Sequence, residues 1–256
     1  MDLKNGTIGI VGGMGPGAGI DLSAKIISQT LSDSDQAHLS QLLFSLPSEI
    51  NDRTAFVMGR VNENPAHAIV RILFQMDRLG VDVAGLACNS AHAPPIFDVI
   101  LQELSSHDTN IRLLNMIEEV ARFIRHYYPG AMRIGILGTT GTLITKLYDR
   151  LEDFGMEVIN VTEKEQAKLH AAIYHSEYGI KSVTNGEYPK ALELLYGACR
   201  SLKERGVELL VFGCTEFPMV HKHHRAEGLP VIDSSMVLAR ALINEVAPEK
   251  LKPWEG

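Results

Sequence analysis

Cysteine is scarce in this chain: three occur among 256 residues, at Cys88, Cys199 and Cys214. So small and odd a number excludes a disulfide framework and is typical of reduced thiols in a cytosolic protein. The N-terminal segment has an apolar run of about four residues, shorter than the roughly 7–15 that a signal peptide needs. We therefore expect a cytoplasmic protein.

The sequence also lacks long apolar runs and basic tracts. No stretch approaches the roughly 20 apolar residues that a transmembrane helix needs, so a membrane protein is excluded. The formal net charge is −7, and no cluster of lysines and arginines is present to attract nucleic acid or an anionic membrane. A hydrophobic content of 45% and a charged content of 21% are ordinary for a globular protein with a sizeable core.

What the chain does contain is an internal duplication. The segment TIGIVGGMG begins at Thr7 and RIGILGTTG begins at Arg133, an offset of 126 residues (133 − 7 = 126). Adding 126 to Cys88 gives Cys214, so both copies carry a cysteine at the same place. Two copies of roughly 120 residues indicate a pseudo-symmetric protein of two domains.

A second similarity between the copies helps to place the domain boundary. IRLLNMIEEVARFI resembles LPVIDSSMVLARALI and aligns Asn115 with Asp233, an offset of 118 (233 − 115 = 118). We expect the last strand and helix to return to the first domain. The predicted domains are residues 1–115 with 229–256, and residues 116–228.

Short apolar runs alternate with helical patterns along the whole chain, which predicts βαβ units and parallel sheets with right-handed crossovers. The predicted fold class is α/β: two pseudo-symmetric parallel-sheet domains with the active site in the cleft between them. The predicted strands are 7–12, 41–46, 81–87, 111–115, 133–138, 156–161, 207–213 and 229–233. The predicted helices are about 17–31, 62–79, 94–104, 116–127, 141–154, 164–179, 187–205 and 234–246.

Two of the cysteines stand where a parallel α/β sheet binds ligands, beyond the carboxyl end of a strand. Cys88 lies in GLACNSAH and Cys214 in FGCTEFP. Most buried cysteines are packing residues, and Cys199, on a predicted helix with no counterpart in the other copy, fits that interpretation. The other two precede polar residues and possible helix N-termini, a setting that favours a thiolate.

Two thiols facing each other across a small site suit one kind of reaction. A thiolate on one face of a carbon atom removes a proton, and a thiol on the opposite face returns one, so the carbon inverts. The pair exchanges roles in the reverse direction. A disulfide would abolish this activity, which agrees with a reducing compartment.

Five motifs, in order, resemble those of the aspartate/glutamate racemase family, most closely its aspartate racemase branch. They are IGIVGGMGP, NDRTAF, CNSAH, GTTGT and GCTE, and they span almost the whole chain. The resemblance implies a cofactor-independent isomerase, without pyridoxal phosphate, that interconverts L- and D-aspartate. It also implies two similar α/β domains with the site between them, and a homodimer.

The resemblance further implies roles for individual residues. Cys88 and Cys214 would be the acid–base groups. Arg53 resembles the family's ligand for the side-chain carboxylate, and Lys181 resembles a substrate lysine of the aspartate branch. Each cation precedes its cysteine by a similar distance (88 − 53 = 35; 214 − 181 = 33), and arginine can hold a carboxylate by two parallel hydrogen bonds. The further implied substrate contacts are Gly13, Met14, Asn89, Ser90, Ala91, Thr139, Thr140, Thr142, Thr215 and Glu216.

The sequence departs from the family pattern in two places. Ser90 stands where threonine is commoner, and its hydroxyl is kept. Gly17 and Gly19 stand where bulkier or hydroxyl residues are more usual. Glycines at a helix start make it less rigid, which bears on the preferred substrate size.

Other motifs carry less weight. GGMGPG lacks the spacing of a dinucleotide fingerprint, and the histidines within residues 221–224 are more typical of a solvated turn than of a metal site. We therefore expect no metal and no cofactor. His92 could tune the Cys88 thiol or cap its loop, and His170 could approach the cleft. The alternatives to an aspartate racemase are a glutamate or broad-specificity amino-acid racemase, a dicarboxylate cis–trans isomerase, and a catalytically silent binding protein for acidic amino acids.

Overall fold

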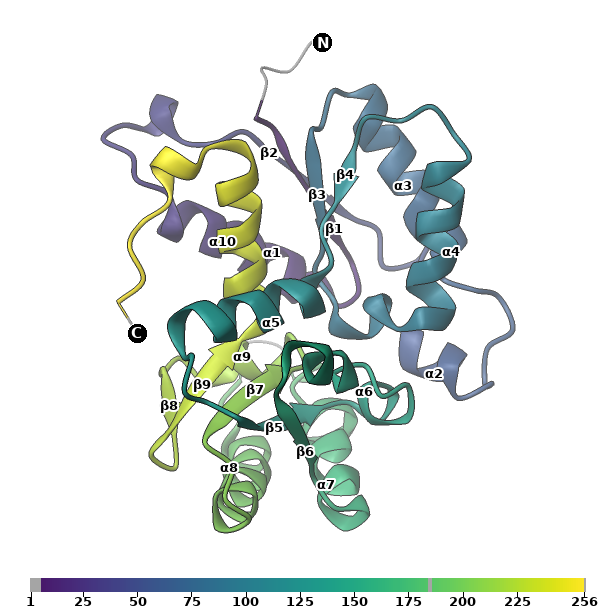
Figure 1. Ribbon diagram of the computed structural model, residues 1–256. Helices are drawn as coiled ribbons and strands as arrows, with labels where there is room; N and C mark the ends of the chain where they lie inside the picture. Colours follow the sequence, from purple (N-terminus) through teal and green to yellow (C-terminus); the bar gives the residue numbers. More distant parts are fainter. Residues whose placement is uncertain (1–5, 184–185, 256) are drawn as a thin grey trace.

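The structure, a computed structural model, describes residues 6–183 and 186–255. Two mainly parallel sheets, each with helices on both faces, form two units that meet across the middle of the molecule (Figure 1). This is the α/β architecture that the alternating pattern predicts.

The first sheet is parallel and has the strand order β2-β1-β3-β4. Its central strands are buried along their whole length, as expected for a sheet covered on both faces. Helices α3 (Ala66–Arg78) and α4 (Pro94–Ser105) cover one face, and α1 (Pro16–Gln29) covers the other. The strands are β1 (Ile8–Gly12), β2 (Gln41–Ser45), β3 (Val83–Leu86) and β4 (Arg112–Leu113).

The second sheet has the order β6-β5-β7-β9-β8, in which only the short β8 is antiparallel. Helices α7 (Glu163–Tyr174) and α8 (Pro189–Glu204) cover one face. The other face is covered by α5 (Met116–Tyr127) and the 3₁₀ helix η3 (Asp149–Phe154). The strands are β5 (Arg133–Gly138), β6 (Glu157–Asn160), β7 (Leu209–Gly213), β8 (Arg225–Ala226) and β9 (Leu229–Asp233).

The end of the chain differs from the predicted assignment of residues 229–256 to the first domain. Strand β9 pairs with β7 of the second sheet, because β7 has a free edge whose backbone groups β9 satisfies. The helix that follows, α10 (Ser234–Val246), packs against the first sheet, with Leu238 and Leu242 over Gly85. The segment after α10 also joins the first unit, through a bridge between Leu251 and Thr30. In the same way α5 leaves the first copy and packs on the second sheet, so the two copies exchange their final helices.

The exchanged helices begin alike, as the alignment of Asn115 with Asp233 indicates. Asn115 Oδ1 accepts a hydrogen bond from Ile117 N over 2.9 Å, and Asp233 Oδ1 accepts one from Ser235 N over 2.9 Å. Each side chain satisfies a backbone N–H that the first turn leaves without a helical partner. The duplication is therefore visible in the capping as well as in the strand order.

The predicted helix at 141–154 is interrupted. It divides into α6 (Thr140–Ile144) and η3, because Lys146 takes a left-handed backbone conformation with φ of 51°. This break turns the Tyr148 side chain into the interior, where it is 2% exposed. The short elements that periodicity did not predict are η1 (Asp35–Ala37), α2 (Arg53–Val57), η2 (Asn89–His92), α9 (Phe217–Val220), β8 and η4 (Pro248–Lys250).

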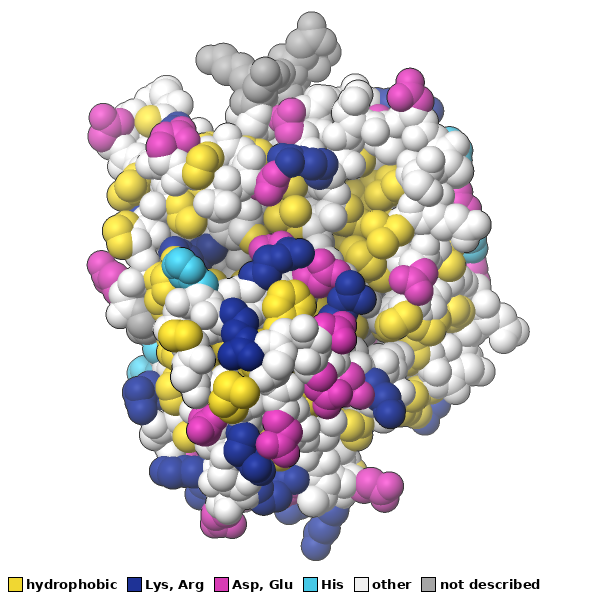
Figure 2. Space-filling view, viewed as in Figure 1, with side chains coloured by type: hydrophobic (Ala, Val, Ile, Leu, Met, Phe, Trp, Pro, Cys, Tyr) yellow, Lys and Arg dark blue, Asp and Glu magenta, His cyan; other side chains and the backbone are white. Residues whose placement is uncertain are grey.

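The surface shows no area of a single charge on the face in Figure 2, where acidic and basic side chains are interspersed. Within residues 6–183 and 186–255, no helix combines the length and the apolar composition required to cross a bilayer.

Candidate active site

A small, narrow cleft lies between the two units, at the carboxyl ends of β1, β3, β5 and β7. This is where parallel α/β sheets present loops to ligands. Both matched cysteines and both predicted cations line it. The lining residues are Met14, Arg53, Thr54, Cys88, Asn89, Ser90, Thr139, Tyr174, Lys181, Cys214, Thr215 and Glu216.

On the side of the first unit, Cys88 lies beside a buried guanidinium. Arg53 is 6% exposed, donates from Nη1 to the carbonyl oxygen of Asn51 over 3.0 Å, and donates from Nη2 to that of Met14. Burial opposes its charge, but the neighbouring Cys88 sulfur and the Asp52 carboxylate outweigh burial and hold the pKa of Arg53 above its ordinary value. The Arg53 guanidinium therefore places a positive charge beside the Cys88 sulfur.

Arg53 also keeps one donor free. Its Nε is buried and has no hydrogen-bond partner among the residues that the structure describes. Leaving a buried donor without a partner is costly. An anionic ligand in the cleft would satisfy it.

His92 supports the Cys88 loop from behind. Its Nδ1 lies 3.0 Å from the carbonyl oxygen of Cys88, and the ring is buried against Phe97. Burial lowers the pKa of His92 to about 4, so the ring is neutral near pH 7. Of the two roles considered for His92, the structure therefore favours holding the loop over supplying a charge.

On the side of the second unit, Cys214 lies beside a carboxylate. Cys214 Sγ donates a hydrogen bond to Glu216 Oε2 over 2.9 Å, and Thr215 Oγ1 donates to the same oxygen over 3.2 Å. Burial, then the charge of Glu216, raise the pKa of the Cys214 thiol well above its ordinary value, against a smaller opposing effect of Lys181. Cys214 is accordingly a protonated donor in this arrangement.

Lys181 completes this side of the cleft. Its Nζ lies 3.2 Å from Glu216 Oε1 and 5.1 Å from the centre of the Tyr174 ring. Burial opposes its charge, but Glu216 and Tyr174 outweigh burial and hold the pKa of Lys181 above its ordinary value. The cleft therefore holds two cations, the buried Arg53 from the first unit and the partly exposed Lys181 from the second.

Two lining residues were absent from the predicted set. Thr54 follows Arg53 in NDRT, so this motif contained a signal for it, and Tyr174 precedes Lys181 by seven residues (181 − 174 = 7). Burial raises the pKa of Tyr174 to about 12, and its ring stacks on His170 at 4.7 Å. His170 thus reaches the cleft only through Tyr174.

Four predicted contacts lie outside the lining. Gly13 forms the turn after β1 with φ of 84°, a left-handed conformation that favours glycine. Ala91 packs in the hydrophobic core. Thr140 Oγ1 lies 3.1 Å from His170 Nδ1, and Thr142 N donates to Thr139 Oγ1 over 3.2 Å.

The departures from the family pattern have local reasons. Ser90 Oγ lies 3.2 Å from Thr139 Oγ1, so the hydroxyl joins the two units across the cleft. A Cβ atom at Gly17 would lie 2.7 Å from Met219 Cε, and one at Gly19 would lie 3.1 Å from Gly12 Cα. Glycine at these positions lets α1 approach β1 and α9 closely.

The remaining cysteine and histidine motifs lie apart from the cleft. Cys199 is fully buried in the second unit's core, and burial raises its pKa to about 12. His221 is held by the Tyr196 hydroxyl at 2.9 Å. Among the described residues, no group of three or more His, Cys, Asp or Glu side chains is arranged to bind a metal ion.

Fold and site together define a two-unit α/β protein with paired thiols and paired cations between the units. A model of the Asp/Glu/Hydantoin racemase family matches residues 11–242. The chain therefore belongs to this family.

Individual relatives agree with that assignment. The broad-specificity amino-acid racemase RacX of Bacillus subtilis is 29% identical over 249 residues, which are 93% of this chain and 96% of the relative. The aspartate racemase of Picrophilus torridus has 27% identity and a TM-score of 0.77, with 94% of each chain covered. Glutamate racemase RacE1 of Bacillus anthracis, with 17% identity and a TM-score of 0.61 over 95% of this chain and 82% of its own, shares the fold.

Proposed function

We propose that this protein is an aspartate racemase that needs no cofactor and uses Cys88 and Cys214 as its two acid–base groups. The observation that carries the proposal is that both thiols line one small cleft together with Arg53 and Lys181. A substrate with two carboxylates matches two cations, and an α-carbon between two thiols can lose a proton to one and gain it from the other.

Substrate binding follows from the donors that the cleft provides. The free Nε of Arg53 suits the side-chain carboxylate of aspartate. Backbone N–H groups of the loops after Cys88 and Cys214 suit the α-carboxylate, where negative charge develops as the α-proton leaves. Lys181 adds a second positive charge to the same small volume.

The reaction begins with Cys88 as thiolate and Cys214 as thiol. The thiolate forms an S–H bond as the Cα–H bond breaks, and the electron pair spreads onto the α-carboxylate. Cys214 then gives its proton to the opposite face of Cα, so that a new Cα–H bond forms as its S–H bond breaks. The product is the opposite enantiomer, and the thiol and thiolate have changed places. Glu216 holds the Cys214 proton before transfer, at 2.9 Å from Sγ.

A broader substrate range is the second candidate, because the relative from Bacillus subtilis that matches 93% of this chain is a broad-specificity racemase. Against it stand two cations in one small cleft: Lys181 is paired with Glu216, but the buried Arg53 has an unpartnered donor at Nε. An apolar side chain would leave that donor without a partner, at a cost in free energy. We therefore expect aspartate to be strongly preferred over alanine.

The test is proton NMR of the reduced, cofactor-free protein with L-aspartate in D2O, with L-glutamate and L-alanine in parallel. Loss of the aspartate Cα–H signal, accompanied by D-aspartate on chiral chromatography, is the expected result. Exchange with another amino acid but not with aspartate would keep the mechanism and refute the substrate. Binding of aspartate without exchange would instead favour the binding-protein alternative.

The proposal includes a homodimer in a reducing, cytoplasmic compartment. All three cysteines are free, as two working thiols require. Helix α1 exposes Ile20 (62%) and Ile27 (49%), with Leu31 (47%) just beyond it, and an exposed apolar stripe is typical of an interface. Analytical ultracentrifugation of the wild type and of Ile20→Asp checks this, since the variant is expected to be monomeric.

A further inference from the structure

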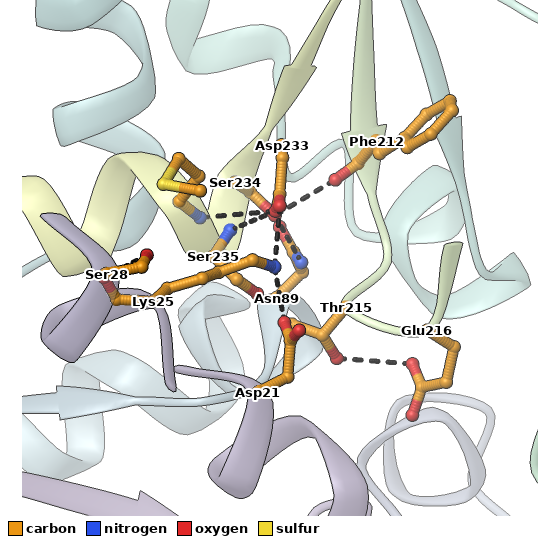
Figure 3. Close-up of polar contacts among 11 residues, drawn as sticks. Asp21, Lys25, Ser28, Asn89, Phe212, Thr215, Glu216, Asp233, Ser234 and Ser235 are labelled. Atoms are coloured by element: carbon orange, nitrogen blue, oxygen red, sulfur yellow. Dashed lines mark hydrogen bonds and ion pairs between the residues drawn. The ribbon is translucent and has the colours of Figure 1, made fainter. Parts of the chain in front are cut away.

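Buried hydrogen bonds behind the cleft join the two catalytic loops. Asn89, the neighbour of Cys88, donates from Nδ2 to Ser234 Oγ over 3.0 Å, and Ser234 Oγ donates to the carbonyl oxygen of Phe212 over 2.9 Å (Figure 3). Phe212 lies in β7, two residues before Cys214, which directly follows that strand. The chain of bonds therefore runs from the residue after one thiol to the strand that carries the other.

Tyr148 adds a third buried member. Its hydroxyl donates to Asn89 Oδ1 over 2.5 Å, and its ring lies so close to Gly213 that a Cβ there would be 2.8 Å from Tyr148 Cε2. Burial raises the pKa of Tyr148 far above its ordinary value, so the phenol remains a donor. Exposure is 2% for Tyr148, 2% for Asn89 and 0% for Ser234. A buried polar network whose members are partnered fixes one geometry.

Ser234 lies where the chain crosses from the second unit to the first. It is the first residue of α10, directly after Asp233 ends β9. Asp233 caps the helix with one oxygen and holds Lys25 of α1 with the other, at 2.6 Å (Figure 3). The backbone around the Ser234 hydroxyl is therefore held in place by contacts with both units.

We propose that Ser234 and Tyr148 are positioning residues that set Cys88 and Cys214 in register for inversion, acting through Asn89 and the Phe212 carbonyl. The inference rests on the proposed racemase function. Both oxygen and nitrogen of the Asn89 amide are engaged in this network, so the side chain that the family resemblance assigns to substrate works first as a tie between units. Since a misplacement of about 1 Å at a reacting centre costs roughly a hundredfold in rate, small shifts between the loops matter.

The chain offers a matched control for this proposal. Ser235 is the next residue of the same helix and is also 0% exposed, but its Oγ has no hydrogen-bond partner among the described residues. Ser234→Ala removes two hydrogen bonds between the loops, whereas Ser235→Ala removes none. Ser234→Thr keeps the hydroxyl and serves as the conservative rescue. Tyr148→Phe removes one bond and keeps the ring, should Ser234→Ala fail to fold.

Two rates are measured in D2O: loss of the aspartate Cα–H signal, and formation of the opposite enantiomer. When the two thiols are correctly placed on opposite faces of Cα, each proton removal leads to inversion, and the two rates are equal. In Ser234→Ala we expect inversion to fall about tenfold with little change in KM. Exchange should fall less, because the carbanion persists long enough for the proton on the Cys88 sulfur to exchange with solvent deuterium, and that deuteron is then returned to the original face of Cα. Ser235→Ala is expected to resemble the wild type, and Ser234→Thr to recover most of the inversion rate.

Three results would overturn or redirect the inference. If Ser234→Ala and Tyr148→Phe both invert aspartate like the wild type, the network has no positioning role. If exchange and inversion fall in the same proportion and the melting temperature falls with them, the role is structural only. If the wild type itself shows neither exchange nor inversion with any amino acid, the racemase function fails before the positioning role is tested.

Discussion

The two copies of the duplicated unit share a backbone plan and differ in the charges beside their cysteines. Cys88 follows β3 and lies beside the Arg53 guanidinium, whereas Cys214 follows β7 and donates to the Glu216 carboxylate. The strand end fixes where each sulfur lies, and the neighbouring side chains fix the charge that it faces. A pseudo-symmetric frame thus holds the two cysteines in unlike electrostatic surroundings.

The two places where the chain crosses between the units, at the starts of α5 and α10, also differ in their side chains. Ser234 aligns with Met116 by the offset of 118 (234 − 118 = 116), and Met116 is a fully buried apolar residue. The hydrogen-bonded tie between the loops therefore exists at the α10 crossover and has no equivalent at the start of α5. Equivalent points of the backbone are thus held by apolar packing in one half and by buried hydrogen bonds in the other.

Of the changes considered, removal of either thiol should lower the racemisation rate most. We expect Cys88→Ala and Cys214→Ala each to lower racemisation by about a thousandfold or more, since each loses an acid–base group. Cys199→Ala, which empties a small space in a core, should keep most of the activity. Chiral chromatography of aspartate measures all three. Substantial racemisation by either single variant of the pair would contradict the two-base mechanism.

Replacing Arg53, the cation of the first unit, by the residue type of the second tests whether a lysine can do the same work there. Arg53→Lys keeps the charge but loses the planar donor set that includes the free Nε. We expect kcat/KM for aspartate to fall by about a hundredfold, mainly through KM. Steady-state kinetics with aspartate and alanine provide the readout. An unchanged KM would show that Arg53 does not bind the carboxylate.

The smallest expected effect concerns the ion pairs of Lys25, one within α1 and one that joins the two units. Lys25 contacts Asp21 and Asp233 and is about one-tenth exposed. Lys25→Met should lower the free energy of unfolding by about 2 kcal/mol, less than for fully buried pairs, and the melting temperature by about 4–8 °C. Arg122→Met, which breaks exposed pairs with Glu118 and Glu119, is the control and should cost under about 1 kcal/mol. Equal losses in calorimetry would contradict the special role of Lys25.

The same lysine predicts a pH dependence of stability. Burial opposes its charge, but Asp233 and Asp21 outweigh burial and raise the pKa of Lys25 above its ordinary value of 10.5. A group whose folded pKa is raised stabilises the protein fully below the unfolded pKa and loses that contribution as pH rises through the folded pKa. The stability difference between wild type and Lys25→Met should therefore shrink above about pH 10.5 in urea titrations. A constant difference would show that the ion pair is not its source.

The sequence predicts the strands and most helices well, because buried parallel strands leave short apolar runs and the duplication confirms them. It also brings Cys88, Cys214, Arg53 and Lys181 to one cleft. The prediction is wrong about β9, because an apolar run does not reveal which sheet offers it a free edge. It also misses the break at Lys146, since a left-handed lysine leaves no mark in hydrophobic periodicity.

Side-chain partners were the least predictable part of the site. The Glu216 carboxylate was expected to contact substrate, but in the structure it accepts from Cys214 and pairs with Lys181. Tyr148 reaches Asn89 from 59 residues along the chain. Such contacts depend on how the two units are set against each other, which one sequence without its fold does not specify.

The central claim is that the two thiols in equivalent positions have unlike surroundings, with Glu216 favouring the protonated form of Cys214, and site-resolved alkylation tests it most directly. Iodoacetamide labelling of each cysteine, followed by mass spectrometry between pH 6 and pH 10, compares wild type with Glu216→Gln. We predict labelling of Cys214 only at high pH, because burial and then the Glu216 charge raise the Cys214 pKa. Glu216→Gln should move the onset for Cys214 to lower pH and leave the labelling of Cys88 unchanged. Labelling of Cys214 at neutral pH in the wild type, with no response to Glu216→Gln, would contradict the account.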